Sequence, residues 1–395
     1  MSSHEPARPA GPASPASPAQ CVPAQWVPSR RPRTARDVLA VLALALLAVT
    51  ALGAVALMLV QVGMGMGVVG IMLALVPLTV VLLGVRWLDR WEPEPRGALL
   101  FGLLWGAGVA VLVSLVVNDL TLYTVAQATG DLDAGVVAAT VVSAPVIEEL
   151  AKGAGVLVLF LARRRYFDGV VDGIVYAGVV AAGFAFTENV LYFGQAGAAL
   201  PETFVLRGLA TPFAHLLFTA CTGAALGLAA RSRHRSAAWW LFPVGLLAAM
   251  TGHGLWNAMS LVAGPAYLMV FAVVQVPLFA GVVALAFWLR RQESAVIRHR
   301  LTEYARAGWF APHEIDMLAS LPRRSTAVGW AERTGGKEAA EAMRRFQRDA
   351  TTLAFRRQLA VTGRTDLHRH AESERDLLAA VTADRHRVLA AAVGR

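Results

Sequence analysis

Eight long apolar segments dominate this chain and restrict what it can fold into. Most of them are longer than the ~18 residues that a membrane-spanning helix requires. Hydrophobic residues make up 56% of the chain, and charged residues only 16%. We therefore predict an all-α, polytopic membrane bundle of about eight transmembrane helices. The predicted spans are residues 37–60, 67–85, 97–117, 136–161, 169–193, 208–230, 237–262 and 266–289.

The charged residues lie mainly outside these spans. Residues 1–36 are rich in Pro, Ala and Ser and are predicted to be a disordered tail. Residues 37–290 are predicted to form the membrane domain, and residues 291–395 an Arg-rich helical tail. The formal charge of +9 arises mostly from loops and tails, so we expect a lipid bilayer as partner and no nucleic acid.

Arginines indicate the orientation of the spans. They precede the first span and follow the second, fourth and sixth, whereas the alternate loops hold little Lys or Arg. The positive-inside rule then places both termini in the cytoplasm of a multi-pass cell-membrane protein. The two cysteines, Cys21 and Cys221, form no CxxC pair, which argues against a thiolate zinc site or a disulfide framework.

The apolar segment 136–161 contains three ionisable residues whose burial in a membrane costs free energy. Glu148, Glu149 and Lys152 fall near its middle, and each ionisable group costs roughly 2.5–3.5 kcal/mol at that depth. Lys152 is spaced to pair with either glutamate. The glutamates differ by about 100° around a helix, so one can face a site while Lys152 holds the other. Of the two, we prefer Glu149 as the general base.

Further polar residues occur at similar depths in three other predicted spans. At about 1.5 Å per residue, these side chains and the glutamates lie roughly 8–20 Å below the outer surface. We therefore expect a single convergent site in the bundle interior, which water reaches from outside. The residues are Glu188 and Asn189 of the fifth span, His215 of the sixth, and His253 and Asn257 of the seventh.

Two histidines and carboxylates can bind zinc with one position open for water. His215, His253 and Glu188 are the predicted metal ligands, and the carboxylates of the Glu148–Glu149 pair supply the base. Without a metal, a Glu–His pair can activate water directly, with Asn257 donating to the developing oxyanion. Both versions describe hydrolysis of a peptide or amide bond within the membrane.

These residues together resemble the PrsW-type intramembrane protease family, which is distantly similar to the type II CAAX prenyl endopeptidases. The resemblance covers about residues 85–290, and its motifs follow in order along the chain. They are Asp89-Arg90-Trp91-Glu92-Pro93-Glu94-Pro95, Glu148-Glu149-x-x-Lys152, Asp172-Gly173 leading into Phe184-x-x-x-Glu188-Asn189, His215, and His253-x-x-x-Asn257.

The resemblance implies a peptidase that cleaves a single-span membrane protein near the outer face. An anti-sigma factor is the substrate type best known for the family. The last motif is often written with Asp where this chain has Asn257, so we interpret that residue as an oxyanion or supporting donor. We assign Asn189 and Asp172 supporting roles, with Asp172 more structural than chemical, and the Asp89–Pro95 loop a structural one.

Two other functions are compatible with these residues. Intramembrane Glu, Lys and His side chains also form proton relays, so a proton- or solute-coupled transporter or channel is the main alternative. Against it, the two halves of the chain show no internal repeat. A non-catalytic scaffold or sensor that works through its tails is the third hypothesis. The sequence identifies neither the substrate nor the metal.

Overall fold

The computed structural model describes residues 35–393 except 165–166, 233, 235 and 364–366. The predicted disordered tail, 1–36, therefore lies almost entirely outside the described residues. The site and the C-terminal helices belong to one compact unit that begins at Leu42. No strand occurs among the described residues, and the predicted all-α fold is confirmed.

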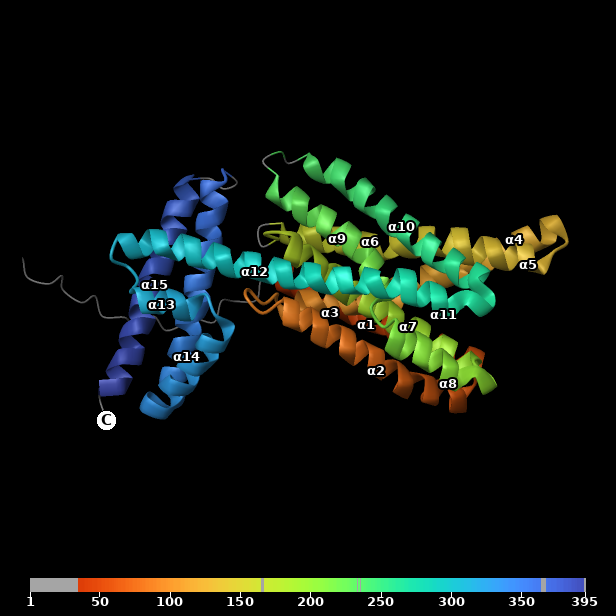
Figure 1. Ribbon diagram of the computed structural model, residues 1–395, viewed down its shortest axis with the longest axis horizontal. Coiled ribbons are helices and arrows are strands. Elements are labelled where there is room, and N and C mark those ends of the chain that lie inside the picture. The colour runs from red at the N-terminus through yellow and green to blue at the C-terminus, as the bar shows by residue number, and fades with distance from the viewer. Residues whose placement is uncertain (1–34, 165–166, 233, 235, 364–366, 394–395) are drawn as a thin grey trace, which may run out of the picture. The chain divides into compact units, whose positions relative to one another are not determined.

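The helices follow one another with few long loops (Figure 1). Several contain a π-helical turn, labelled η, a feature often found at functional sites. In order, the main segments are α1 (Ala35–Val62), α2 (Met64–Leu88), α3 (Arg96–Leu104), η1 (Trp105–Ala110), α4 (Val111–Thr129), α5 (Leu132–Val137), η2 (Ala138–Ser143), α6 (Ala144–Arg163), α7 (Val170–Gln195), α8 (Leu200–Thr203), η4 (Phe204–Ala210), α9 (Ala214–Arg231), α10 (Ala237–Ala263), α11 (Tyr267–Val270), η6 (Phe271–Gln275), α12 (Val276–Arg306), α13 (Pro312–Leu318), α14 (Leu321–Val361) and α15 (Leu367–Val393).

Seven helical stretches of the described residues are long and apolar enough to cross a membrane. They correspond to seven of the eight predicted spans. The other, 237–262, forms the 27-residue helix α10 but is not among the seven. The Gly, His and Asn residues that α10 contributes around the site lower its mean hydropathy. The residues that identify the site therefore make the helix harder to recognise as a membrane span.

The third and fourth spans are longer than predicted. The third continues from Arg96 to Thr129 and the fourth from Leu132 to Arg163. Gly130, in the left-handed region with φ 70°, ends α4 and permits the short turn between them. Figure 1 shows α4 and α5 projecting as a hairpin past the neighbouring helices.

Helix α7 lies at the centre of the bundle and is the most buried of the spans. Small residues let its neighbours approach very closely: a Cβ on Gly173 would lie 1.9 Å from the Gly223 carbonyl oxygen of α9. A Cβ on Gly183 would lie 2.0 Å from the Leu103 carbonyl oxygen of α3. Small residues at such crossings are typical of packing in lipid, where apolar burial adds little. These contacts fix α7 and α9, which carry four of the predicted site residues: Asp172, Glu188, Asn189 and His215.

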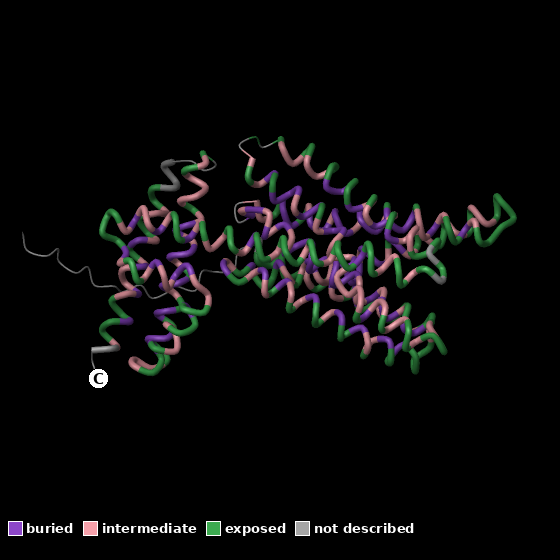
Figure 2. The backbone as a smooth tube through the Cα atoms, viewed as in Figure 1, coloured by how far each residue is buried: buried purple, intermediate pink, exposed green. Residues whose placement is uncertain are grey.

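The outer helices show the inverse pattern. Large apolar side chains on α1 and α2 remain exposed, such as Leu46, Val60 and Met72. Figure 2 shows the buried positions gathered in the inner helices of the bundle and again among the C-terminal helices. Exposed apolar faces around a buried interior are expected of a protein surrounded by lipid.

The C-terminal helical domain, defined as residues 297–393, has a hydrophobic core of its own. Helix α12 leads into it without interruption (Figure 1), and α14 contains a kink at Gly336, whose φ is 71°. Its core includes Ile297, Leu301, Phe346 and Leu353, all nearly inaccessible to solvent. The predicted Arg-rich tail is therefore a folded helical domain rather than a loose appendage.

Candidate functional site

The predicted glutamates lie one turn into α6, which begins directly after the π-helical turn η2. Glu149 is fully buried, and every neighbour that binds it is polar. Lys152 Nζ lies 2.6 Å and His253 Nδ1 lies 3.0 Å from Glu149 Oε1. Thr219 of α9 donates its hydroxyl to Glu149 Oε2 at 2.9 Å. Glu149 thus joins α6, α9 and α10, and both its oxygens are occupied.

Glu148 occupies a different environment. It lines a cavity of about 730 Å³, and its Oε2 has no hydrogen-bond partner among the described residues. That oxygen lies 3.6 Å from Lys152 Nζ and 3.9 Å from His253 Nε2. Of the two glutamates, only Glu148 lines the cavity, and its Oε2 accepts no hydrogen bond from the described residues.

Lys152 stands between the glutamates and the first histidine. Its ammonium is inaccessible to solvent, lies 3.3 Å from His215 Nδ1 and sits 4.3 Å from the centre of the Phe184 ring. The ring face and Glu149 together compensate for removing this charge from water. Lys152 therefore contacts both Glu149 and His215. The helical spacing predicted the contact with the glutamate.

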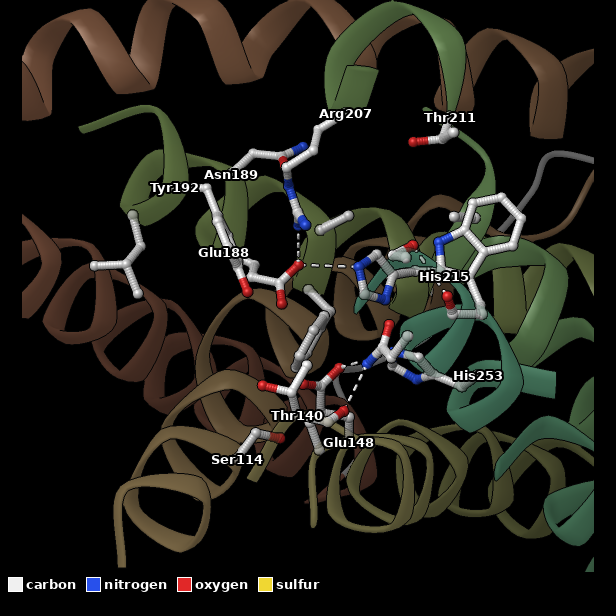
Figure 3. Close-up of a pocket in the computed structure, with 18 of the residues that line it drawn as sticks. Ser114, Thr140, Glu148, Glu188, Asn189, Tyr192, Arg207, Thr211, His215 and His253 are labelled. Carbon is white, nitrogen blue, oxygen red and sulfur yellow. Dashed lines mark hydrogen bonds and ion pairs between the residues drawn. The ribbon is translucent and has the colours of Figure 1, made fainter. Parts of the chain in front are cut away.

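Glu188 of α7 forms the opposite side of the site (Figure 3). Its Oε2 lies 2.9 Å from His215 Nε2 and 2.5 Å from Arg207 Nη2. Arg207 also donates from Nε to Asn189 Oδ1 at 3.1 Å and stacks 3.8 Å from the centre of the Tyr192 ring. Glu188 is therefore a fixed anion that orients one face of the His215 ring.

Arg207 was missed as a site residue by sequence reasoning, which treated it as part of a loop. It lies in η4, a π-helical turn that brings the chain back toward the bundle before α9. A lone arginine near the edge of an apolar segment was the available signal. Thr219 was missed too, because a threonine in an apolar helix carries no chemical signature of its own.

Asn257 and His253 share one face of α10, as their spacing predicts. The Asn257 side chain donates from Nδ2 to the Thr140 carbonyl oxygen in η2 at 2.9 Å. Hydrogen bonding to a π-helical turn is understandable, because such a turn disturbs the regular i to i−4 pattern. One Nδ2 proton is used there, and the second remains for a ligand.

Asp172 lies apart from this site, at the N-terminus of α7. Its Oδ2 accepts hydrogen bonds from the backbone N–H of Asp168 at 2.5 Å and of Gly169 at 3.1 Å. These bonds satisfy N–H groups that the start of a helix leaves unpaired. The structure thus places Asp172 as a helix cap, separated from Glu188 by four turns of the same helix.

The metal-ligating groups of the described residues converge at one place. Single ligand atoms of Glu148, His215 and His253 all lie within 4.8 Å of one another. This set differs from the predicted ligands by containing Glu148 in place of Glu188. Two imidazoles and a carboxylate fit the donor set of catalytic zinc sites, and the unpartnered Glu148 oxygen fits it as well. Glu149 and Glu188, which contact the histidines, match the outer carboxylates that orient such ligands.

The Asp89–Pro95 loop lies away from the cavity and packs against the C-terminal helical domain. Trp91 is buried in that domain's core, with the Arg324 guanidinium 4.8 Å from its ring centre. Asp89 accepts the Glu94 backbone N–H at 3.0 Å, and Glu94 accepts a hydrogen bond from the Tyr176 hydroxyl of α7. Burial raises the pKa of Glu94 to about 7. The loop is a structural connection, in agreement with its interpretation from sequence.

Comparison with known proteins yields one consistent family. Residues 94–282 match the family described as "PrsW family intramembrane metalloprotease". The chain is 29% identical over 153 residues to "Protease PrsW" of Clostridioides difficile (strain 630), covering 38% of this chain and 62% of that protein. It is 34% identical over 141 residues to "Protease PrsW" of Geobacillus kaustophilus (strain HTA426), covering 36% and 58%.

The chain spans less than two thirds of the length of either relative, and the family match, residues 94–282, includes the bundle residues that form the site. No solved structure matches the chain. The resemblance drawn from the ordered motifs is confirmed: residues 94–282 of this chain are similar to the PrsW family of intramembrane proteases.

Proposed function

We propose that this protein is an intramembrane protease in which Glu148 contacts the attacking water. The observation that carries the proposal is the division of labour between adjacent glutamates. Glu149 has both oxygens occupied by protein groups, whereas Glu148 lines the cavity with an oxygen free. We therefore exchange the roles favoured from sequence: Glu148 acts on water, and Glu149 positions His253.

Each neighbouring group has a task in this mechanism. Glu149 accepts the Nδ1 proton of His253, which turns Nε2 toward Glu148. From the other side of the cavity Glu188 accepts the Nε2 proton of His215, which leaves Nδ1 of that ring facing Lys152. The second Nδ2 proton of Asn257 donates to the oxygen of the substrate carbonyl as negative charge develops there. After attack, the proton taken from water passes to the leaving nitrogen.

A zinc ion fits this site, with His215, His253 and Glu148 as the residues that would hold it. When bound, it would lower the pKa of a coordinated water and polarise the scissile carbonyl. Without it, Glu148 accepts the water proton itself. With zinc, Glu148 would hold the ion, and without it Glu148 contacts the reacting water, so the same substitution tests both versions.

We propose a single-span membrane protein as substrate, cleaved near the outer face, with both termini of the protease in the cytoplasm. An anti-sigma factor is the substrate type that the family resemblance implies. The arginine distribution supports the orientation, and the convergence of the site in the bundle supports cleavage within the membrane. The transporter alternative is not favoured, because the matched family and both relatives are proteases.

The decisive variant is Glu148→Gln, which keeps the shape of the side chain and removes the base. We expect it to lower cleavage of a co-expressed, doubly tagged single-span protein by more than about 100-fold, as loss of a general base does. Its thermal stability should remain near that of the wild type. Glu202→Gln is the matched control, because Glu202 lines the same cavity but is exposed. Full activity of Glu148→Gln would contradict the assignment of Glu148 as the residue that acts on water.

Metal analysis of purified protein tests the zinc. We expect about one zinc ion per chain in the wild type and loss of most of it in His253→Ala. His299→Ala serves as control, because the His299 side chain is 72% exposed in the C-terminal helical domain. Equal metal contents in wild type and His253→Ala would exclude His253 as a ligand and leave the version in which Glu148 alone activates water.

A further inference from the structure

A second polar wall of the cavity has no role in the chemistry described above. It begins with Ser114 of α4, whose side chain is almost fully buried and lines the cavity. Its hydroxyl has no hydrogen-bond partner among the described residues. Thr121 and Thr124 of the same helix donate to carbonyl oxygens four residues earlier, at 2.8 Å each. The Ser114 hydroxyl, unlike these two, makes no bond to a carbonyl oxygen of its own helix. A buried hydroxyl without a partner destabilises the folded protein.

Asn118 follows one turn later on the same face of α4 and also lines the cavity. Its Oδ1 accepts the Ser143 hydroxyl of η2 at 2.8 Å, and Ser143 lies 3.1 Å from the Thr121 hydroxyl. This network fixes the orientation of the amide. The Nδ2 group, which carries two protons, has no partner among the described residues and is left for a ligand.

The two side chains line the same cavity as Glu148, His215 and His253. Figure 3 shows Ser114 and Thr140 on the same side of the pocket as Glu148, opposite Arg207 and Thr211. Two other hydroxyls that line the cavity donate to carbonyl oxygens of their own segment. Ser260 donates to the Trp256 carbonyl at 3.0 Å and Thr211 to the Leu206 carbonyl at 2.9 Å.

A membrane-anchored substrate brings a particular problem into such a cavity. To expose a peptide bond to water, its helix must unwind, and the unwound backbone N–H and C=O groups lose their partners. In a cavity with little water, each unsatisfied group is costly. The protease must therefore supply donors and acceptors next to the reacting bond.

We propose that Ser114 and Asn118 form a subsite that hydrogen-bonds the main chain of an extended substrate segment beside the scissile bond. The subsite rests on the proposed proteolytic function and specifies how the substrate is held. Asn118 Nδ2 donates to a substrate carbonyl, and the Ser114 hydroxyl pairs with the next free backbone group. Because the contacts are to backbone, the subsite selects segments that unwind easily rather than a particular side chain.

Kinetics of the full-length protein in proteoliposomes test the subsite. The probe is a synthetic single-span peptide with a Leu-Ala helix, a Gly-Ala segment at its outer end, and a fluorophore and quencher on either side. We expect Ser114→Ala and Asn118→Leu each to raise KM by about 2- to 10-fold, the effect of one neutral hydrogen bond. The value of kcat should stay within about twofold. Ser260→Ala is the matched control and should leave KM unchanged.

A second readout separates binding from folding. Ser114→Ala removes a hydroxyl that has no partner, so its melting temperature should equal or exceed that of the wild type. A lowered melting temperature with unchanged KM would overturn the subsite, as would unchanged KM in both variants. If the wild type cleaves the probe and neither variant changes KM, the subsite proposal alone is wrong. A wild type that cannot cleave the probe overturns the proposed function as well.

Discussion

The carboxylates of the bundle site lie beside fixed cations, whereas those around the Asp89–Pro95 loop are held mainly by neutral groups. Glu149 lies 2.6 Å from Lys152, and Glu188 lies 2.5 Å from Arg207. In the loop region, Glu94 accepts the Tyr176 hydroxyl, and Glu92 lies 3.4 Å from the Thr352 hydroxyl. Both groups of carboxylates are enclosed, so burial alone does not explain the difference.

The difference reflects two uses of a buried acid. A carboxylate beside a cation stays ionised and can orient a histidine or meet water. A buried carboxylate without a close cation tends to take up a proton instead, because loss of water disfavours its charge. Accordingly, burial raises the pKa of Asp89 and of Asp168 to about 6 each. We interpret the bundle site as chemical and the loop region as a structural connection to the C-terminal helical domain.

The largest effect should follow from removing the cation of the bundle site. Lys152→Met leaves Glu149 buried without its closest partner and removes the group beside His215 Nδ1. We expect destabilisation by about 3–5 kcal/mol, the usual result of breaking a buried ion pair, together with loss of measurable cleavage. Chemical denaturation in detergent and the doubly tagged substrate measure the two effects.

Comparison with Glu148→Gln sharpens this prediction. That variant should lose activity without losing stability, because the Glu148 oxygen has no hydrogen bond to lose. If Lys152→Met proved as stable as Glu148→Gln, the cation would have no structural role, and the contrast between the two regions would disappear.

The loop region should respond to the loss of packing rather than of charge. Trp91 is 6% exposed and lies in the core of the C-terminal helical domain, whereas Trp330 is 40% exposed on α14. Trp91→Ala should destabilise that core by about 3–5 kcal/mol, and Trp330→Ala should cost much less. Hydrogen exchange of α14 and α15 measures the effect, while the zinc content should stay unchanged. Equal protection of these helices in both variants would contradict the docking of Trp91.

Much of the bundle site was predictable because helical geometry is regular. A rise of 1.5 Å per residue was enough to place His215, His253 and the glutamates at a common depth. Which glutamate faces the cavity was not predictable, since it depends on the Thr219 hydroxyl of a helix 70 positions away. Arg207 was hidden by the π-helical turn that returns it to the site.

The loop region shows a stronger limit. The Asp89–Pro95 loop could be interpreted as structural from its prolines, but its partner could not be identified. The hydroxyl of Thr352 that approaches Glu92 lies 260 positions along the chain. No periodicity or local motif reports such a contact. The Arg-rich composition of residues 291–395 predicted a helical tail, and it concealed an interior in which large apolar residues outnumber alanines.

The smallest and most specific effect concerns pH. Burial, followed by the negative charges of Asp168 and Glu94, raises the pKa of Glu92 from 4.5 to about 8, although Thr352 and Arg356 act in the opposite direction. A carboxyl with a higher pKa in the folded chain binds its proton more tightly there than in the unfolded chain. Raising the pH from about 4.5 to about 8 should therefore progressively lower the stability of this region.

Substitution of the same residue isolates this effect. Glu92→Gln keeps a neutral side chain at every pH, so its melting temperature should fall less than that of the wild type between pH 5.5 and pH 8. Because Asp89, Glu94 and Asp168 titrate nearby in the same direction, part of the pH dependence should remain. Asp316→Asn, at an exposed ion pair with Arg298, should reproduce the wild-type slope. An identical slope in wild type and Glu92→Gln would show that Glu92 is already ionised in the folded protein, and the loop would then resemble the bundle site in holding charge.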